Sequence, residues 1–316
     1  MPNDESTAAA LTVGQKKADE ILAGRKIARA RRADALSIHA RRLELNVRVT
    51  TAGAEVAATS MQTAGFLVAA GDSWFDYPFH DVLKLLEDNY GYNIESAAHR
   101  GDPIETMAYQ GGQLDKFARC LEKVLAHGVT PKAVLMSGGG DDIAGNEFGM
   151  LLNNATSNIG GWNSEIVDGV LNQRIITAYK SMLGSIMRLC EQDLGKSIPI
   201  FVHGYDYPIP DGRGFWGGWP FPGPWLEPGF REKLFTNLAT NIALMRDIID
   251  RFNQMLAALV KEPAFENVYY IDLRGTLSTE LASDAYKDWW DNELHPTAKG
   301  FTAVTDKFAA GLSKLQ

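Results

Sequence analysis

The sequence predicts an α/β fold of three layers, in which helices cover both faces of a five-stranded parallel sheet, with a helical extension at the N-terminus. Two observations predict the sheet: short apolar runs recur along the chain, and each is followed by a helical pattern. A third observation separates the extension: residues 1–60 carry a net charge of +3, whereas the remainder carries −11. We therefore expect an N-terminal helical extension over residues 1–60 and an α/β domain over residues 61–316.

The extension is expected to form one long helix over residues 18–45, because this segment is rich in Ala, Arg, Leu and Ile and lacks proline. Residues 46–58 are expected to form a short strand or an irregular link. A basic cluster on this helix can indicate an acidic partner. The favoured alternative is a solvated helix face that packs on its own domain or on a second subunit. The cluster comprises Arg25, Lys26, Arg29, Arg31 and Arg32. A homo-oligomer formed through this helix is the corresponding hypothesis.

Five short segments are the expected strands, and most of them are apolar runs of the kind formed by parallel strands buried on both faces. In chain order they cover residues 66–70, 93–98, 133–137, 198–202 and 268–272. Helical patterns alternate with them over residues 81–90, 113–126, 173–194, 230–259 and 296–315. Ligands of such a sheet bind at the carboxyl ends of its strands, so functional residues are sought there.

Composition and charge exclude several classes of function. With 45% hydrophobic and 22% charged residues, the chain has the composition of an ordinary globular protein. A net charge of −8 argues against nucleic-acid binding, which needs a basic surface, and favours a small neutral substrate. No apolar run is long enough to span a membrane, and the N-terminus lacks the apolar core of a signal peptide, so a cytoplasmic location is expected.

Residues able to carry out chemistry follow the expected strands. Ser73 stands in the turn GDSWFD after the first strand, where its hydroxyl can be exposed. His295 stands in NELHPT, before the proline that opens the last helix, and Gly101 in HRGDP can bring a backbone N–H close to a substrate. Each of these residues alone is more typical of a turn or a helix cap. Together they supply a nucleophile, a base and an oxyanion donor.

Four short sequence blocks, taken in order, resemble the SGNH hydrolase superfamily, also called GDSL-type lipases and esterases. The blocks are GDSWFD, the glycine at position 101, GGDD over residues 139–142 and ELHPTAKGF around position 295, and they span residues 66–301. The resemblance implies the flavodoxin-like fold of that superfamily. It also implies that Ser73 is the nucleophile, that His295 is its base and that Gly101 supplies an oxyanion-hole N–H.

The sequence departs from the family pattern at two positions. Asp141 stands where the third block has an asparagine that donates a hydrogen bond to the oxyanion, and an ionised carboxylate can only accept. Either Asp141 is protonated in a dry site, or activity is impaired, or the residue serves another purpose. Asn292 occupies the position of the acid that orients the histidine. Asp291 is the preferred substitute, and a Ser-His dyad oriented by Asn292 or by a backbone carbonyl is the alternative.

Residues 204–229 are expected to form a functional loop, because they follow the fourth strand and are too rich in Gly and Pro for regular structure. Their aromatic rings can wall a substrate pocket or pack the loop onto the domain. The candidate substrate-binding residues of this loop are Phe215, Trp216, Trp219, Phe221 and Trp225. Trp74, beside the nucleophile, adds apolar surface. No metal-ligand spacing occurs among the His and Cys residues, so neither a metal nor a cofactor is expected.

These observations favour a serine esterase or acylhydrolase that cleaves a carboxylic ester of a small molecule through an acyl-enzyme intermediate. The expected oxyanion hole comprises Ser73, Gly101 and Asp141. Two alternatives stay open. One is a catalytically weakened protein that keeps the fold for a binding or scaffold role, and the other is a carbohydrate deacetylase.

Overall fold

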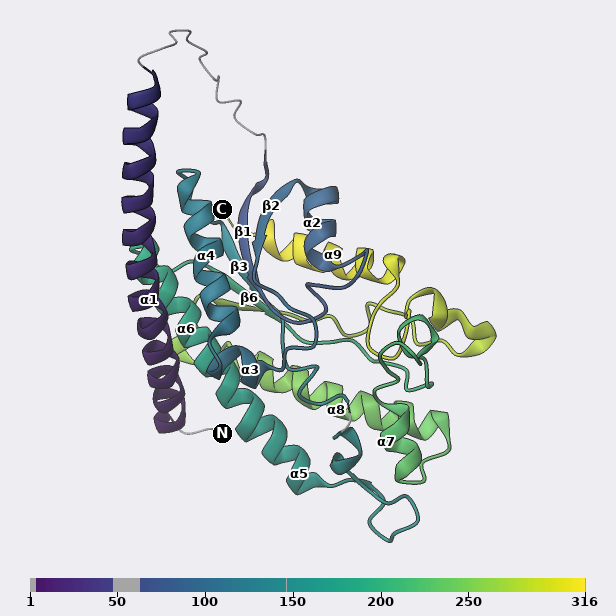
Figure 1. The fold of residues 1–316 in the computed structure, drawn as a ribbon. Helices are drawn as coiled ribbons and strands as arrows, with labels where there is room; N and C mark the ends of the chain where they lie inside the picture. The colour runs from purple at the N-terminus through teal and green to yellow at the C-terminus, as the bar shows by residue number, and fades with distance from the viewer. Residues whose placement is uncertain (1–3, 48–62, 146, 316) are drawn as a thin grey trace.

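The computed structural model describes residues 4–47, 63–145 and 147–315. Its centre is a five-stranded parallel sheet with the order β2-β1-β3-β6-β7 (Figure 1). The strands are β1 (Gly65–Ala70), β2 (Tyr92–Ser96), β3 (Ala133–Met136), β6 (Ile200–His203) and β7 (Val268–Ile271). This is the flavodoxin-like order, whose switch point lies between β1 and β3. The predicted sheet is therefore confirmed.

Helices cover both faces of this sheet, so the predicted three-layer arrangement is also confirmed (Figure 1). On one face, α2 (Val82–Tyr90) packs on β2 and α9 (Ala298–Leu312) packs on β7. On the other face, α4 (Gly112–Ala126) packs on β1 and β2, and α8 (Leu238–Leu259) packs on β6. The helix α6 (Ile176–Leu194) contacts both α4 and α8. Shorter helices are α3 (Ile104–Tyr109), α5 (Ser164–Gly169) and α7 (Glu227–Glu232).

Two elements differ from the expected pattern. The single helix expected over residues 230–259 is divided into α7 and α8, because Leu234 adopts a left-handed φ of 65° between them. The side chain of Asn237 then caps α8 by accepting a hydrogen bond from the N–H of Thr240 at 3.0 Å. A small antiparallel ribbon of β4 (Leu152–Asn153) and β5 (Gly161–Trp162) was not expected, since strands of two residues show no periodicity.

The N-terminal helix α1 (Asp4–Val47) starts well before the predicted residue 18 and packs along α6 and α4 (Figure 1). Small residues on one face permit this contact. A Cβ atom on Gly14 would lie only 2.0 Å from the carbonyl oxygen of Ser181 on α6. The hydroxyl of Ser185 donates to the carbonyl of Gly14 at 2.8 Å. The first half of α1 is thus part of the helical layer that covers the sheet.

Two arginines of the predicted basic cluster pair within the chain. Arg25 and Arg29 contact the carboxylate of Glu122 on α4 at 2.5 and 2.7 Å, and Arg29 also contacts Asp193 on α6 at 2.7 Å. The observed packing on the chain's own domain is one of the expected alternatives for this cluster. A homo-oligomer and a boundary near residue 60 stay predictions, and most of the expected link, residues 48–58, lies outside the described residues.

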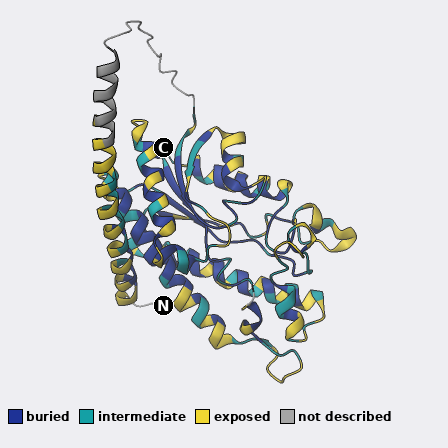
Figure 2. Ribbon diagram, in the orientation of Figure 1, coloured by how far each residue is buried: buried dark blue, intermediate teal, exposed yellow. Residues whose placement is uncertain are grey.

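The strands of the central sheet are largely buried, whereas α1 exposes its outer side (Figure 2). β1 and β3 hold the fully buried side chains at the middle of this core, including Leu67, Val68, Val134 and Leu135. Within the part of the chain that the structure describes, no helix is both long and apolar enough to cross a membrane.

Candidate active site

The turn that follows β1 is held rigidly by a buried carboxylate. Asp72 accepts hydrogen bonds from the hydroxyl of Ser137, at 2.6 Å, and from the hydroxyl of Tyr205. Gly71 permits the close approach of β3, because a Cβ atom at this position would lie 2.8 Å from the Cβ of Ser137. The turn therefore fixes Ser73, which is half-buried, at the carboxyl edge of the sheet next to the switch point.

His295 lies within hydrogen-bond distance of this serine. Its Nε2 is 2.7 Å from Oγ of Ser73, and its Nδ1 is 3.0 Å from Oδ1 of Asn292. The same Oδ1 accepts the backbone N–H groups of Leu294 and His295, both at 3.0 Å, and these groups can only donate. The amide orientation is thereby fixed. Nδ1 of His295 carries the proton, and Nε2 is free to accept the proton of Ser73.

Aromatic rings enclose the imidazole of His295. Tyr77 stacks on it with ring centroids 4.3 Å apart, and Trp225 approaches edge-on at 5.7 Å. Burial lowers the pKa of His295 to about 3, because the charged imidazolium would lose its hydration. Asn292 is neutral and supplies no negative charge that would oppose this shift. The imidazole is consequently an uncharged base at neutral pH.

The carboxylate of Asp291, the preferred orienting acid in the sequence, does not contact the imidazole of His295 in the described structure. This carboxylate accepts the hydroxyl of Tyr77 at 2.7 Å and the amide of Asn292 at 3.3 Å. Asn292 is fully buried and faces the imidazole, whereas its neighbour Asp291 is exposed. Consecutive side chains of this irregular loop point in different directions, and the side chain that reaches the imidazole is the amide of Asn292.

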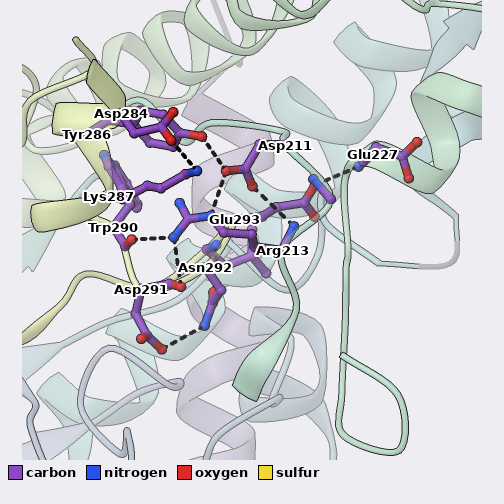
Figure 3. Close-up of polar contacts among 12 residues, drawn as sticks. Asp211, Arg213, Glu227, Asp284, Tyr286, Lys287, Trp290, Asp291, Asn292 and Glu293 are labelled. Atoms are coloured by element: carbon purple, nitrogen blue, oxygen red, sulfur yellow. Dashed lines mark hydrogen bonds and ion pairs between the residues drawn. The ribbon is translucent and has the colours of Figure 1, made fainter. Parts of the chain in front are cut away.

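Glu293 connects two loops beside the site. One is the loop of residues 204–229, the aromatic loop, and the other is the loop of residues 291–297 around His295, the histidine loop. The carboxylate of Glu293 is completely buried, and burial raises its pKa while hydrogen bonds from backbone N–H groups oppose that rise. Four such groups donate to it, at 2.6 to 3.0 Å, and they belong to Gly212, Trp225, Leu226 and Glu227. Figure 3 shows Glu293 and Glu227. One side chain thus holds both ends of the aromatic loop beside His295.

Arg213 makes a second connection between the same two loops. Its Nη1 donates to the carbonyl oxygens of Trp290 and Asp291 at 2.8 and 3.0 Å (Figure 3). Asp211 accepts its Nε at 2.6 Å and also accepts the hydroxyl of Tyr286 at 2.7 Å. These contacts involve backbone carbonyls of the residues just before Asn292, so they restrict the path of the histidine loop.

Two cavities meet at Ser73. The larger, of about 380 Å³, is lined by Ser73, Gly101, Asp141 and His295 together with aromatic and proline residues. The smaller, of about 50 Å³, has Ser73 and Asp141 in its wall and is otherwise mainly apolar. The larger cavity lies in the size range of small-molecule sites. Among the described residues, no three His, Cys, Asp or Glu side chains are arranged to hold a metal ion.

The aromatic residues expected to bind substrate fall into two groups. Phe215 and Trp225 line the larger cavity, and the buried Trp74 lines the smaller one. Trp216 and Trp219 line neither, and they are 64% and 94% exposed. The reason is their place in the loop: Glu293 ties Trp225 to the histidine loop, whereas Trp216 and Trp219 are at the tip.

The GGDD turn after β3 contributes two aspartates with different surroundings. Asp142 accepts the N–H of Ile104 at 2.7 Å and so caps α3. Asp141 lies in the wall of both cavities, and its Oδ2 is buried with no hydrogen-bond partner in the described structure. Burial raises the pKa of Asp141 to about 8, and the nearby carboxylates of Asp72, Asp142 and Asp102 add to this rise.

Gly101 shares the larger cavity with Ser73 and His295. It has a positive φ of 80°, a conformation that favours glycine at this turn. Tyr77 and the clamp formed by Glu293 were missed by sequence reasoning. Tyr77 follows directly on the block GDSWFD, and proximity to the nucleophile is the signal that could have identified it. The bonds of Glu293 join distant parts of the chain, and no local pattern marks them.

The similarities of this chain to known proteins are remote and are found among solved structures. No protein-family model and no curated protein matches the chain. The chain is similar to the structure of a GDSL-like lipase from Bacteroides thetaiotaomicron, with 11% identity, a TM-score of 0.40, and coverage of 80% of this chain and 89% of that one. It is also similar to a catalytic mutant of an acetylxylan esterase from Geobacillus stearothermophilus, with 14% identity, a TM-score of 0.41, and coverage of 79% and 94%.

Proposed function

We propose that this protein is a serine hydrolase that cleaves a carboxylic ester. The observation that carries the proposal is the line of hydrogen bonds from Ser73 Oγ to His295 Nε2, at 2.7 Å, and from His295 Nδ1 to Asn292 Oδ1, at 3.0 Å. A hydroxyl next to an oriented, neutral imidazole is the arrangement that activates a serine nucleophile. This pair lines a cavity large enough for a small ester.

In the proposed reaction, Oγ of Ser73 attacks the ester carbonyl while His295 Nε2 accepts its proton. Asn292 keeps the imidazole in the required tautomer by accepting the N–H of Nδ1. The backbone N–H groups of Ser73 and Gly101 are assigned to the oxyanion. His295 then protonates the leaving alcohol, and an acyl group stays on Ser73. A water molecule, activated by the same imidazole, releases the acid.

The two cavities support an assignment of the two halves of the substrate. We assign the acyl group to the smaller cavity, because its volume of about 50 Å³ is far below the volume of the larger one, about 380 Å³. This leaves room for a group of about acetyl size. The larger cavity, with Phe215 and Trp225 in its wall, is assigned to the alcohol. An acetyl ester of a bulky alcohol is therefore the expected substrate class.

The test is hydrolysis of p-nitrophenyl acetate, butyrate and octanoate by the wild type and by Ser73→Ala. The acetate should be the best substrate, and Ser73→Ala should lower kcat by at least about 10³-fold. Ser313→Ala, at an exposed position on the far end of the chain, is the control and should leave kcat unchanged. An active Ser73→Ala variant would contradict the proposal. So would a wild type that neither turns over an ester nor reacts with an active-site phosphonate, a result that favours a binding protein.

A further inference from the structure

The carboxyl group of Asp141 stands out because it is placed for catalysis and has no partner. It reaches from the turn after β3 into the wall of both cavities that contain Ser73. Its Oδ2 is buried, and in the described structure no hydrogen-bond donor contacts it. An ionised carboxylate in this position would be strongly disfavoured, since burial removes water and nothing replaces it. A protonated carboxyl would instead carry an O–H that can point into the cavities that Asp141 and Ser73 both line.

The charged groups around Asp141 favour the neutral form. Three carboxyl groups lie near it: Asp72 after β1, Asp102 between β2 and α3, and Asp142 in the same turn. The hydroxyl of Tyr205, which follows β6, donates to Asp72 and so supplies no charge to Asp141. His295 shares the larger cavity with Asp141 and is neutral.

Two arginines share a cavity wall with Asp141, and both pair with other carboxylates. Arg100 lines the larger cavity, and Arg174 lines a third cavity that Asp141 also lines. Arg100 contacts the carboxylate of Asp76 at 3.3 Å, and Arg174 contacts that of Glu105 at 3.1 Å. In the described structure neither arginine forms an ion pair with Asp141. No cation therefore compensates a negative charge on this residue.

The neighbouring aspartates already have donors, and this locates the proton. Asp72 accepts the hydroxyls of Ser137 and Tyr205, and Asp142 accepts the N–H of Ile104. Asp141 has no comparable bond in the described structure. Burial raises the pKa of Asp141 to about 8 and that of Asp142 only to about 6, because the N–H of Ile104 favours the ionised form of Asp142.

We propose that Asp141 is a neutral carboxylic acid in the working enzyme and donates a hydrogen bond to the oxyanion that forms when Ser73 attacks the ester. The inference rests on the proposed function and adds a third, side-chain donor to the two backbone N–H groups. The proton stays on the Asp141 carboxyl throughout, and the negative charge stays on the substrate oxygen until the tetrahedral intermediate collapses. The carboxyl of Asp141 and the imidazole of His295 must then be uncharged at the same time.

The working pH range follows from these two protonation states. His295 must be neutral, so activity falls as pH drops through its pKa, which burial lowers to about 3. Asp141 must be protonated, so activity falls as pH rises through its pKa, which burial raises to about 8. The enzyme is expected to work best between these limits, in acidic to neutral solution.

The experiment is the pH profile of kcat/KM for p-nitrophenyl acetate, corrected for spontaneous hydrolysis, in the wild type and in Asp141→Asn. Above about pH 8 the wild type should lose activity roughly 10-fold per pH unit, because the protonated fraction of Asp141 falls about 10-fold with each unit. In Asp141→Asn this alkaline limb should vanish, because an amide donates at every pH. Asp142→Asn, which changes the adjacent carboxyl in the same turn, is the matched control and should retain the limb.

A second readout does not depend on turnover. At pH 7, the infrared difference spectrum between Ser73→Ala and Ser73→Ala with Asp141→Asn should contain the carbonyl band of a protonated carboxyl, because the pKa of Asp141 rises to about 8 and that of Asp142 only to about 6. An alkaline limb that is identical in the wild type and Asp141→Asn would overturn the donor role while leaving the esterase intact. If no ester is turned over, the proposed function fails. Absence of the infrared band would then separately overturn the protonated state of Asp141.

Discussion

The histidine loop and the GGDD turn face the same serine, but they satisfy their buried polar groups in opposite ways. In the histidine loop, Oδ1 of Asn292 receives three hydrogen bonds and the carboxylate of Glu293 receives four. In the GGDD turn, one carboxyl oxygen each of Asp141 and Asp142 is buried without a partner in the described structure. Buried polar groups normally have partners, so the second pattern is the exceptional one.

The difference separates groups that fix geometry from groups that are left for a ligand. A carboxylate such as Glu293, with every contact made inside the protein, can only hold its neighbours in place. The carboxyl of Asp141, which lines both cavities and has no partner inside the described structure, can donate to a substrate. Substitutions in the histidine loop should therefore alter orientation and stability, whereas those at Asp141 should alter the pH dependence of catalysis.

The largest effect is expected from Asn292→Ala. It removes the acceptor of His295 Nδ1–H, so the imidazole loses both its tautomer and its orientation, and kcat should fall by about 10²- to 10⁴-fold. Asn292→Asp is the matched control, because it keeps an acceptor at the same place. Its negative charge should raise the pKa of His295 and shift the acid limb of the pH profile upward. Wild-type kcat in Asn292→Ala would show that Asn292 does not orient the histidine.

Glu293→Ala should mainly affect stability. The substitution leaves four backbone N–H groups without their acceptor, and the free energy of unfolding in urea should fall by about 2–4 kcal/mol. KM should rise as well, because Trp225 is then no longer held in the cavity wall. Glu191→Ala, at an exposed position on α6, should change stability by less than about 0.5 kcal/mol. Equal stability of the two variants would rule out the clamp.

The fold was predictable because its strands carry a strong local signal. Strands buried on both faces form continuous apolar runs, and such runs marked β1, β3 and β6. The edge strand β2 has a mixed sequence and is mostly half-buried, so its signal was weaker. The start of α1 was not predictable in this way. Its contact with α6 uses Ala10, Gly14 and Ala18, and small residues give a weak apolar pattern although they permit close packing.

The site was predictable only in part, for a related reason. Ser73 and His295 stand at the ends of regular elements, and the structure brings them together. The choice between Asp291 and Asn292 depends on which of two neighbouring side chains points inward in an irregular loop. No periodicity governs such a loop, so the sequence left both possibilities open.

The smallest effect is expected from Asp291→Asn, and it tests this last point directly. The carboxylate of Asp291 contacts Tyr77 and the amide of Asn292 but not the imidazole, and the backbone bond from Asp291 N–H to the His295 carbonyl is kept in the variant. An asparagine keeps an oxygen for the Tyr77 hydroxyl, and kcat should change by less than about 3-fold, equivalent to about 0.6 kcal/mol. The measurement is kcat with p-nitrophenyl acetate from pH 4 to 8. A fall comparable to that of Asn292→Ala would mean that Asp291 moves against the imidazole during catalysis and is the orienting acid after all.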